Sequence, residues 1–348
     1  MNAYEALAQK HGYGGSARYR KVMETLLTPI QAQIALELPA QPEDLAAKLK
    51  VGVDKVKAEI KDMFRKGVAI PRNFETMEGA RFPRSVTQLH DASEASYFVQ
   101  DLFGDRLFQA WEDFSQKEWY PRYAQEYAKR DQPFDRVIPA YKAIQGMAGV
   151  TQFDDIREVL KAASLIATVP CSCRNQARKL DVILDSCLQF GRSGEYAIVR
   201  QSGRKLSYEE ALDIIDQVED HGQVHMFVNA QMLSYGVMCN CTNDACIAWT
   251  PLLQHGVPVN KRAAKSRFEA AIDQELCDGC QVCVDRCQFD AITMGKVAGS
   301  KRLKAQLDME KCWGCGVCVL KCAPEAISMK LVRPLEHIPK ERPAPAPA

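Results

Sequence analysis

Eight of the fourteen cysteines in this 348-residue chain fall into two runs of identical spacing. Each run reads C-x-x-C-x-x-C-x-x-x-C, and the second follows the first by 35 residues. The eight are Cys277, Cys280, Cys283, Cys287, Cys312, Cys315, Cys318 and Cys322. Three thiolates on a tight loop can bind three irons of one [4Fe–4S] cluster, while the fourth thiol is carried toward a second cluster. The spacing therefore predicts two [4Fe–4S] clusters.

The fourth cysteine of each run is expected to serve the cluster of the other run. The first cluster would be bound by Cys277, Cys280, Cys283 and Cys322. The second would be bound by Cys312, Cys315, Cys318 and Cys287. Ala-Ile and a later Met follow both runs, which indicates an internal duplication. Glycines at 279, 314 and 316 are expected to let the backbone approach inorganic sulfide closely.

The segment from about residue 275 to 330 resembles the bacterial two-cluster ferredoxins. This resemblance implies a βαβ-type pseudo-twofold fold that holds two cubane clusters. Gln288 and Ala323 depart from the family pattern, because they stand where proline is usual and Pro324 comes one place later. Two zinc sites are the alternative, since four cysteines also suit zinc. Zinc ribbons place a longer spacer between two C-x-x-C pairs, so the unbroken tandem runs favour iron–sulfur clusters.

Composition adds broad constraints. Lys and Arg number 45 against 44 Asp and Glu, a net charge of +1, which gives no global attraction to nucleic acid or an acidic membrane. No run of about eighteen apolar residues predicts a membrane span, and the amino terminus lacks the apolar core of a secretory signal. We therefore expect a cytoplasmic protein whose cysteines are metal thiolates, because the cytosol keeps thiols reduced.

An N-terminal module is predicted over residues 16–78. A short helix around Leu45 and Leu49 precedes a second helix, capped by Asp54 and ended by Gly67, and a short strand follows at 68–70. This order resembles a winged helix-turn-helix. A DNA-binding module of this kind would present the basic residues of its second helix to the major groove. These are Lys55, Lys57, Lys61, Arg65 and Lys66.

Three acidic residues on the same helix offset most of that positive charge, so we favour a solvated face or a protein-docking module over a DNA reader. Residues 79–132 are expected to be helical, with a stripe of aromatic residues in the core. The proline- and alanine-rich segment 334–348 is expected to be disordered.

A mixed α/β, cysteine-rich domain is predicted over residues 133–265. Short apolar runs at 164–169, 196–200 and 224–228 indicate strands. A helix lies between the last two, begun by a capping box of Ser207 and Glu210. With the two-cluster unit at 266–333, the expected architecture is a multi-domain α+β protein.

This middle domain contains the remaining six cysteines. They are Cys171, Cys173, Cys187, Cys239, Cys241 and Cys246. Two C-x-C pairs follow predicted strands and are expected to meet at one sheet edge, where four thiols could bind one cubane or one tetrahedral metal. The other two would be redox-active, part of a less usual cluster, or simply buried. Arg174 could offset thiolate charge, and His225 is more often a structural residue than a ligand.

The pattern CSCR, CLQFG, VHMFVN and CNC resembles a cysteine-rich domain found beside ferredoxin modules in iron–sulfur proteins of anaerobes. That domain shows further cysteines where this chain has Thr242 and the stretch NQARKLDVILD, so its ligand set does not transfer whole. We expect a third metal or cluster site among the six central cysteines. Bare C-x-C thiols would otherwise be prone to oxidation.

We therefore predict an iron–sulfur electron-transfer protein, a carrier or subunit of an anaerobic oxidoreductase system that works with redox partner proteins. The chain has no phosphate loop and none of the usual nicotinamide, flavin or hydrolase motifs. Two alternatives remain open. One is a redox enzyme that binds substrate at the central cysteines, and the other is a redox-sensing winged-helix regulator that binds DNA.

Overall fold

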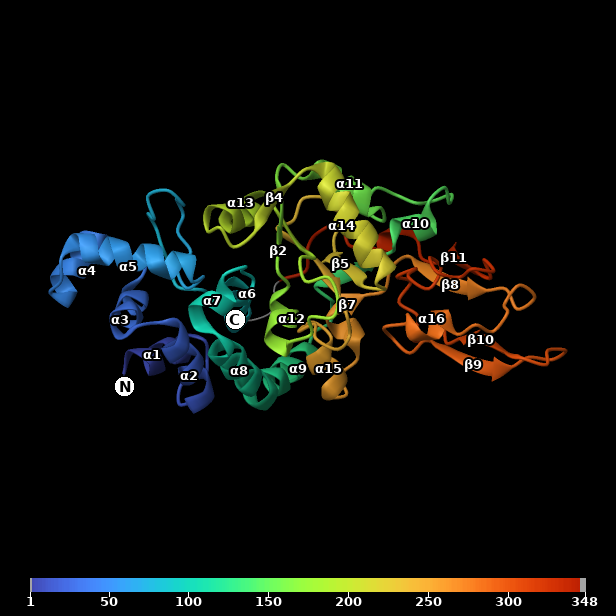
Figure 1. Cartoon of the computed structure of the whole chain (residues 1–348), viewed down its shortest axis with the longest axis horizontal. Coiled ribbons are helices and arrows are strands. Elements are labelled where there is room, and N and C mark those ends of the chain that lie inside the picture. Colours follow the sequence, from blue (N-terminus) through green and yellow to red (C-terminus); the bar gives the residue numbers. More distant parts are fainter. Residues whose placement is uncertain (1, 345–348) are drawn as a thin grey trace.

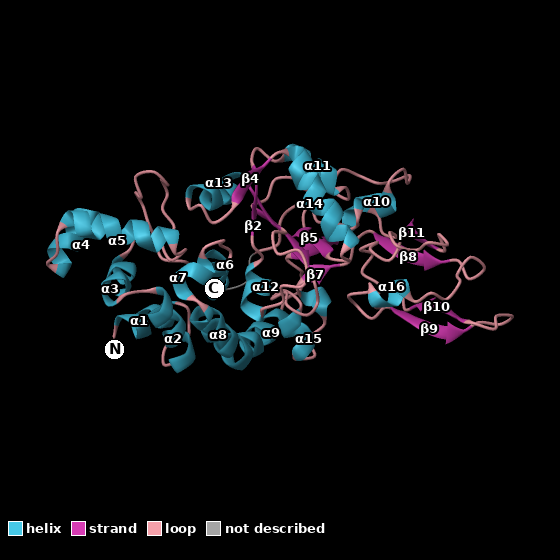
Figure 2. Ribbon diagram, viewed as in Figure 1, coloured by secondary structure: helices cyan, strands magenta, loops and turns pink. Residues whose placement is uncertain are grey.

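The computed structural model describes residues 2–344. Helices gather in the N-terminal half, and strands gather in the middle and at the C-terminal end (Figure 2). The mixture of helices and separate, mostly antiparallel sheets makes this an α+β protein. None of the helices in residues 2–344 combines the length and apolar character needed to cross a membrane.

The N-terminal region is a run of short helices (Figure 1). They are α1 (Ala3–Lys10), α2 (Ala17–Leu26), α3 (Pro29–Glu37), α4 (Pro42–Leu49) and α5 (Val53–Arg65). Helix α5 is strongly amphipathic and buries Val56, Ile60 and Phe64. Gly67 follows it at a φ of 81°, and a single bridge then pairs Ile70 with Arg81. The two predicted helices and the turn between them are present, but the strand predicted at 68–70 is reduced to this single bridge, and Gly52 occupies the cap position expected for Asp54.

The aromatic segment is helical, as predicted. It comprises α6 (Val86–Glu94), α7 (Val99–Phe103), α8 (Asp105–Phe114), the π-helical η1 (Ser115–Trp119) and α9 (Tyr120–Ala128). Most of its aromatic side chains are buried, although Tyr97 is exposed, and the Phe114 ring stacks on Tyr19 of α2 at 4.4 Å between centroids. One hydrophobic core therefore runs from Leu7 to Tyr127.

A seven-stranded sheet in the order β4-β2-β3-β6-β5-β1-β7 forms the centre of the molecule. Its strands are β1 (Asp135–Ile138), β2 (Ile166–Val169), β3 (Cys187–Phe190), β4 (Arg204–Leu206), β5 (Val224–Val228), β6 (Val237–Cys241) and β7 (Ala263–Ala264). Only β1 and β7 pair in parallel. The helices of this region are α10 (Tyr141–Ile144), α11 (Ile156–Ala162), α12 (Ser172–Ala177), α13 (Gly191–Val199), α14 (Tyr208–Asp220), α15 (Thr250–Gln254) and the short 3₁₀ helix η2 (Val259–Lys261).

Several central elements match the sequence predictions. Strand β2 falls inside the predicted run 164–169, and β5 has its predicted bounds. Helix α14 begins with the predicted capping box, in which Ser207 and Glu210 bond each other's backbone.

Two central predictions are wrong. Residues 196–200 belong to the end of helix α13, because Gly194, Ala197 and Arg200 are buried at a spacing of three, which is a helical period and not a strand period. The second C-x-C pair lies within strand β6 and not in a loop after β5, because β5 and β6 form an antiparallel pair.

The C-terminal unit repeats its structure as well as its cysteines. It contains β8 (Phe268–Ile272), α16 (Val282–Asp285), β9 (Ile292–Lys296), β10 (Leu303–Leu307) and β11 (Ile327–Leu331). The 35-residue offset that relates the cysteines also carries β8 onto β10 and β9 onto β11. Strand β8 pairs with β11, and β9 pairs with β10. Each two-stranded sheet therefore takes one strand from each copy.

The segment after this unit differs from the expected disordered tail. Residues 335–337 form a 3₁₀ helix, η3, and Ile338 is buried. The backbone N–H and the side chain of Gln231 donate hydrogen bonds to the carbonyls of Pro339 and Ile338. Residues 345–348 lie outside the described residues.

Candidate iron–sulfur and thiol sites

Each predicted cluster takes three thiols from one run and the fourth from the other run, and such a group of four is called a crossed set. The first crossed set comes together at the outer end of the C-terminal unit. Cys277, Cys280, Cys283 and Cys322 line one small cavity of about 20 Å³. Burial raises the pKa of Cys283 to about 11, and the neighbouring Cys280, Cys322 and Cys277 raise it further. Cys280 is exposed, and Leu276 beside this set keeps 53% of its surface exposed.

The second crossed set lies deeper. Burial raises the pKa of Cys315 to about 12, and charges on Cys287 and Cys312 act in the same direction. Burial raises the pKa of Cys318 well above its usual value, and charges on Cys315, Cys312, Cys287 and Cys283 act in the same direction. A metal centre that binds Cys315 and Cys318 would therefore have to displace their protons.

Two equivalent glycines set the distance between the copies. Gly279 has a φ of 80°, and a Cβ there would lie 2.3 Å from the carbonyl oxygen of Leu303. Gly314 has a φ of 67°, and a Cβ there would lie 1.9 Å from the carbonyl oxygen of Phe268. Leu303 and Phe268 are related by the same 35-residue offset. Glycine is therefore required on each cysteine loop, where the backbone passes against the first strand of the other copy.

The eight thiols suit two iron–sulfur clusters. Each crossed set supplies four sulfur donors, the number that a [4Fe–4S] cluster takes from protein. The cavity of the first set is closed by the apolar side chains of Met294, Ala305 and Ile327, which would limit the access of water to a bound cluster.

The six central cysteines also come together. All six line one cavity of about 90 Å³ in the middle domain. Cys171 caps α12, Cys187 begins β3, and Cys246 lies in the turns before α15. Cys239 and Cys241 lie on β6, where alternate residues share one face of the sheet.

The register of strands β3 and β6 explains why Cys187 lies beside Cys239. Leu188 pairs with Met238, and Gln189 pairs with Val237. Continuing this register by one residue sets Cys187 opposite Cys239. The Sγ atom of Cys187 also accepts a hydrogen bond of 3.3 Å from the side chain of Gln189.

The six thiols form a series of neighbours that shift one another's pKa. It runs through Cys171, Cys173, Cys246, Cys241, Cys239 and Cys187. The Sγ atoms of Cys246 and Cys241 are 3.2 Å apart. Hydrogen bonds from Cys173 and Cys241 lower the pKa of Cys246 to about 5. Those from Cys187 and Cys241 likewise lower the pKa of Cys239. Ionisation is therefore favoured at Cys246 and Cys239 over the other four central thiols, whose pKa values are raised.

Arg174 is placed to balance this charge. It is almost fully buried, lines the same cavity, and lowers the pKa of Cys171 in opposition to the larger effects of Cys173 and of burial. Its guanidinium donates 2.8 Å hydrogen bonds to the Ser186 hydroxyl and the Asn240 carbonyl. The predicted role of Arg174 beside the thiols thus agrees with its position.

His225 is a structural residue. Its Nδ1 lies 2.5 Å from Oδ1 of Asn240, and its Nε2 lies 3.2 Å from a carboxylate oxygen of Glu219. Both ring nitrogens are therefore occupied within the protein, and neither is available to a metal.

The structure adds an acidic residue that sequence reasoning missed. Asp91 comes from α6 in the N-terminal core and lines the central cavity. One of its carboxylate oxygens accepts a hydrogen bond of 3.0 Å from Ser172, which stands between Cys171 and Cys173. Asp91 is 80 residues from the nearest cysteine, and no local motif marks it.

The thiols are spread out and do not surround one point. Within residues 2–344, no group of three or more His, Cys, Asp or Glu side chains is placed to hold a single metal ion. This holds for the C-terminal and central thiols alike. A mononuclear tetrahedral site would require the sulfurs to move toward a common centre.

Aromatic side chains fill the space between the central thiols and the second C-terminal set. The Trp249 and Phe289 rings meet edge to face at 5.3 Å, and Phe289 stacks on Trp313 at 5.2 Å. Cys241, Cys246 and Cys315 belong to the same hydrophobic cluster. The backbone N–H of Ala140 also donates a hydrogen bond of 2.8 Å to the carbonyl of Cys315. Buried protein therefore joins the two groups of thiols.

Gln288 contributes to this junction. Its side-chain oxygen accepts a hydrogen bond of 3.0 Å from the Asn243 N–H, and its backbone carbonyl accepts one of 2.8 Å from the Asn243 side chain. Its amide donates to the carbonyl of Gly222 at 3.3 Å. The glutamine that replaces the usual proline thus ties the C-terminal unit to the middle domain.

Residues 276–326 match the family described as the 4Fe-4S dicluster domain. This match covers both cysteine runs, so the C-terminal unit is a ferredoxin-like domain with an iron–sulfur electron-transfer role. No curated protein and no solved structure matches the chain.

Proposed function

We propose that this protein carries electrons through two [4Fe–4S] clusters to a third centre at the six central cysteines, as a component of an anaerobic oxidoreductase system. The first cluster would be held by Cys277, Cys280, Cys283 and Cys322. The second would be held by Cys312, Cys315, Cys318 and Cys287. A [4Fe–4S] cluster supplies reversible one-electron redox chemistry at a potential set by its surroundings.

The observation that carries this proposal is the cavity shared by Cys322 and the first cysteine run. Cys322 is 39 residues beyond Cys283, and the crossed pairing of strands brings the two together. Exchange of the fourth ligand between runs is the arrangement typical of two-cluster ferredoxins.

The difference in burial between the two sets of thiols supports a direction for electron transfer, from the outer set toward the central thiols. The first set of thiols is the more exposed, and Leu276 and Val282 present apolar side chains beside it. The second set is buried against Phe289 and Trp313, which face the central thiols. Redox partner proteins would therefore dock at the outer set, and the central thiols would lie at the inner end.

The N-terminal module is proposed to dock protein and not DNA. Several of its basic residues already have partners. Lys57 pairs with Glu43 at 3.5 Å, Lys66 pairs with Asp62 at 2.6 Å, and the Arg65 guanidinium covers the Phe98 ring at 5.0 Å.

We propose that the chain divides into four domains or segments. These are a winged-helix-like module (16–78), an aromatic helical segment (79–132), a cysteine-rich domain (133–265) and a ferredoxin domain (266–333).

Iron and acid-labile sulfide analysis, with EPR spectroscopy of anaerobically purified full-length protein, tests the proposal. About eight irons per chain would establish two clusters, and about twelve would add the third centre. Reduction should produce the signals of interacting [4Fe–4S]⁺ clusters. A colourless preparation that contains zinc and no iron would overturn it.

A further inference from the structure

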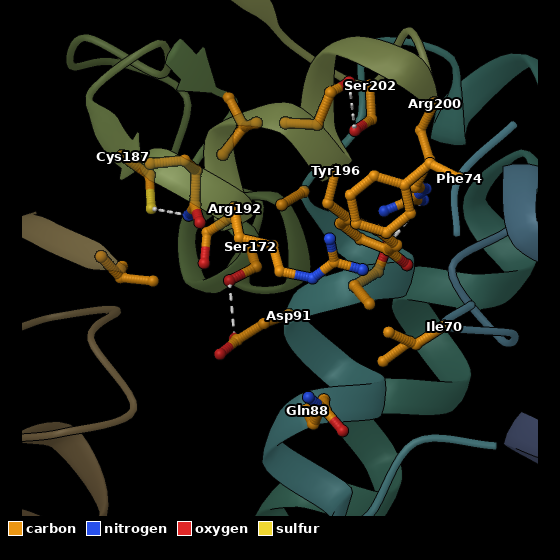
Figure 3. Close-up of a pocket in the computed structure, with 17 residues that line it drawn as sticks. Ile70, Phe74, Gln88, Asp91, Ser172, Cys187, Arg192, Tyr196, Arg200 and Ser202 are labelled. Carbon is orange, nitrogen blue, oxygen red and sulfur yellow. Dashed lines mark hydrogen bonds between the residues drawn. The ribbon is translucent and has the colours of Figure 1, made fainter. Parts of the chain in front are cut away.

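A larger cavity adjoins the central thiols. It has a volume of about 370 Å³ and lies between α6 and α13, with β2, β3 and β6 forming its floor (Figure 3). Asp91, Ser172 and Cys187 line both this cavity and the thiol cavity. Its volume lies within the usual range of small-molecule sites, and such sites often form where two domains meet.

Both apolar and polar groups line its wall. Ile70, Phe74, Val169, Ala197 and Val237 provide an apolar lining. Cys187 stands at one side, beside Ser172 and its hydrogen bond to Asp91, while Arg192, Tyr196 and Arg200 gather on the other side with Phe74 (Figure 3). A ligand that fits this wall would have an apolar body and a polar group near the arginines.

Arg200 is a buried cation for which the described part of the chain, residues 2–344, offers no acidic partner. Its side chain is only 4% exposed. It donates hydrogen bonds of 3.0 and 2.9 Å to the carbonyls of Arg65 and Ala92, and its Nε–H has no partner. The hydroxyl of Tyr196, whose ring lies under this guanidinium, is also buried and without a partner. An unpaired buried charge is costly, so this side of the cavity is suited to an anion.

Arg192 adds a second, more exposed guanidinium. It covers the Phe74 ring at 4.2 Å and makes a weak pair with Glu195 at 3.7 Å. Two guanidinium groups and the single carboxylate of Asp91 give the lining a net charge of about +1. A monoanion complements that charge, and the planar guanidinium matches the two oxygens of a carboxylate.

We propose that this cavity binds a small organic monocarboxylate, with its carboxylate at Arg200 and Arg192 and its apolar body directed toward Cys187. The site is separate from the clusters of the ferredoxin domain. It rests on the proposed function only in that the far end of the ligand would lie against the central redox centre.

Anaerobic isothermal titration calorimetry of the full-length protein with phenylacetate and hexanoate tests this inference. We expect saturable binding with a dissociation constant of about 1 mM or lower. Phenylacetamide, the neutral counterpart, should bind roughly 10- to 100-fold more weakly, because it lacks the charge-assisted hydrogen bonds. Inorganic phosphate should not compete.

Three variants locate the site. Arg200→Gln should weaken phenylacetate binding roughly 10- to 100-fold. Because Arg200 also bonds the carbonyls of α5 and α6, Arg192→Gln and Val237→Phe serve as variants that leave those bonds intact. Arg192→Gln should weaken binding, and Val237→Phe should weaken it by narrowing the cavity. Arg204→Gln, at an exposed arginine outside the lining, is the matched control and should bind normally.

The inference is overturned if neither carboxylate binds, if phenylacetamide binds equally well, if phosphate binds and the carboxylates do not, or if Arg192→Gln and Val237→Phe leave affinity unchanged. Iron analysis of the same samples separates the two proposals. An iron-loaded protein that binds no carboxylate fails only this inference, and a zinc-loaded protein that binds carboxylate fails only the proposed function.

Discussion

The two groups of cysteines are built in different ways. The eight C-terminal cysteines lie on two loops related by a 35-residue repeat, and they separate into two sets of four. The six central cysteines come from helix α12 and its cap, two neighbouring strands and a turn, and they line one cavity. A short repeated motif can specify a site from sequence, whereas a site assembled from distant elements depends on the tertiary fold.

The strongest test of this contrast exchanges single cysteines in the C-terminal unit. Under the proposed assignment, in which each cluster takes its fourth ligand from the other run, Cys322→Ser and Cys277→Ser should disturb the same EPR signal, and Cys287→Ser should disturb the other. Each variant should lose up to about half of the eight ferredoxin irons. If Cys322→Ser instead altered the same signal as Cys312→Ser, the crossed assignment would be wrong.

A second substitution tests whether the central site binds iron independently of the ferredoxin clusters. Cys239→Ser removes a thiol that lines the central cavity together with Cys187 and Cys241, so it should eliminate any iron beyond about eight per chain and leave the ferredoxin EPR signals in place. Iron analysis and EPR on the same sample measure both effects. Loss of the ferredoxin signals together with the extra iron would show that the two regions do not load separately.

A buried ion pair joins the two regions. Arg267, just before β8, contacts Asp154 of the middle domain at 2.6 Å, and their side chains are 5% and 2% exposed. Arg267→Met should lower the free energy of unfolding by about 3–5 kcal/mol, because it leaves the Asp154 carboxylate buried without its partner. Anaerobic chemical denaturation measures this change.

The exposed pair of Lys161 and Glu158 provides the control for that experiment. Lys161→Met should change stability by less than about 1 kcal/mol. Equal effects of the two substitutions would argue against a stabilising role for the buried junction.

The smallest predicted effect concerns close approach within the C-terminal unit. Gly314→Ala should destabilise by about 1–3 kcal/mol beyond Gly299→Ala, because only the former places a Cβ against a backbone carbonyl while both have positive φ. Thermal unfolding of the two variants measures the difference. Equal melting temperatures would show that the loop relaxes away from Phe268.

The limits of sequence prediction follow the same division. The cysteine spacing predicted a duplicated C-terminal unit, and the 4Fe-4S dicluster match and the repeated strands agree with it. The central cysteines were recognised as a group, but their order of contact depends on the antiparallel pairing of β3 and β6, which no local pattern encodes. Residues 196–200 are a short apolar run, and such runs do not distinguish strand from helix by periodicity alone.

Residues that act from a distance were also beyond local patterns. Asp91 reaches the thiols from the N-terminal core. Arg200 differs from other arginines in its burial, which no local sequence pattern predicts. The sequence predicted which residue types could do chemistry, and the fold determined which of them meet.

The exchange of strands between the two copies has a consequence for biosynthesis. Strand β8 finds its partner only in β11, whose last residue is Leu331, and β9 finds its partner in β10. A ribosome that has made the first copy alone has produced neither sheet. Delivery of the clusters in the cell would therefore have to wait until the second copy has left the exit tunnel. A chain cut between the copies would offer assembly factors no complete cluster site.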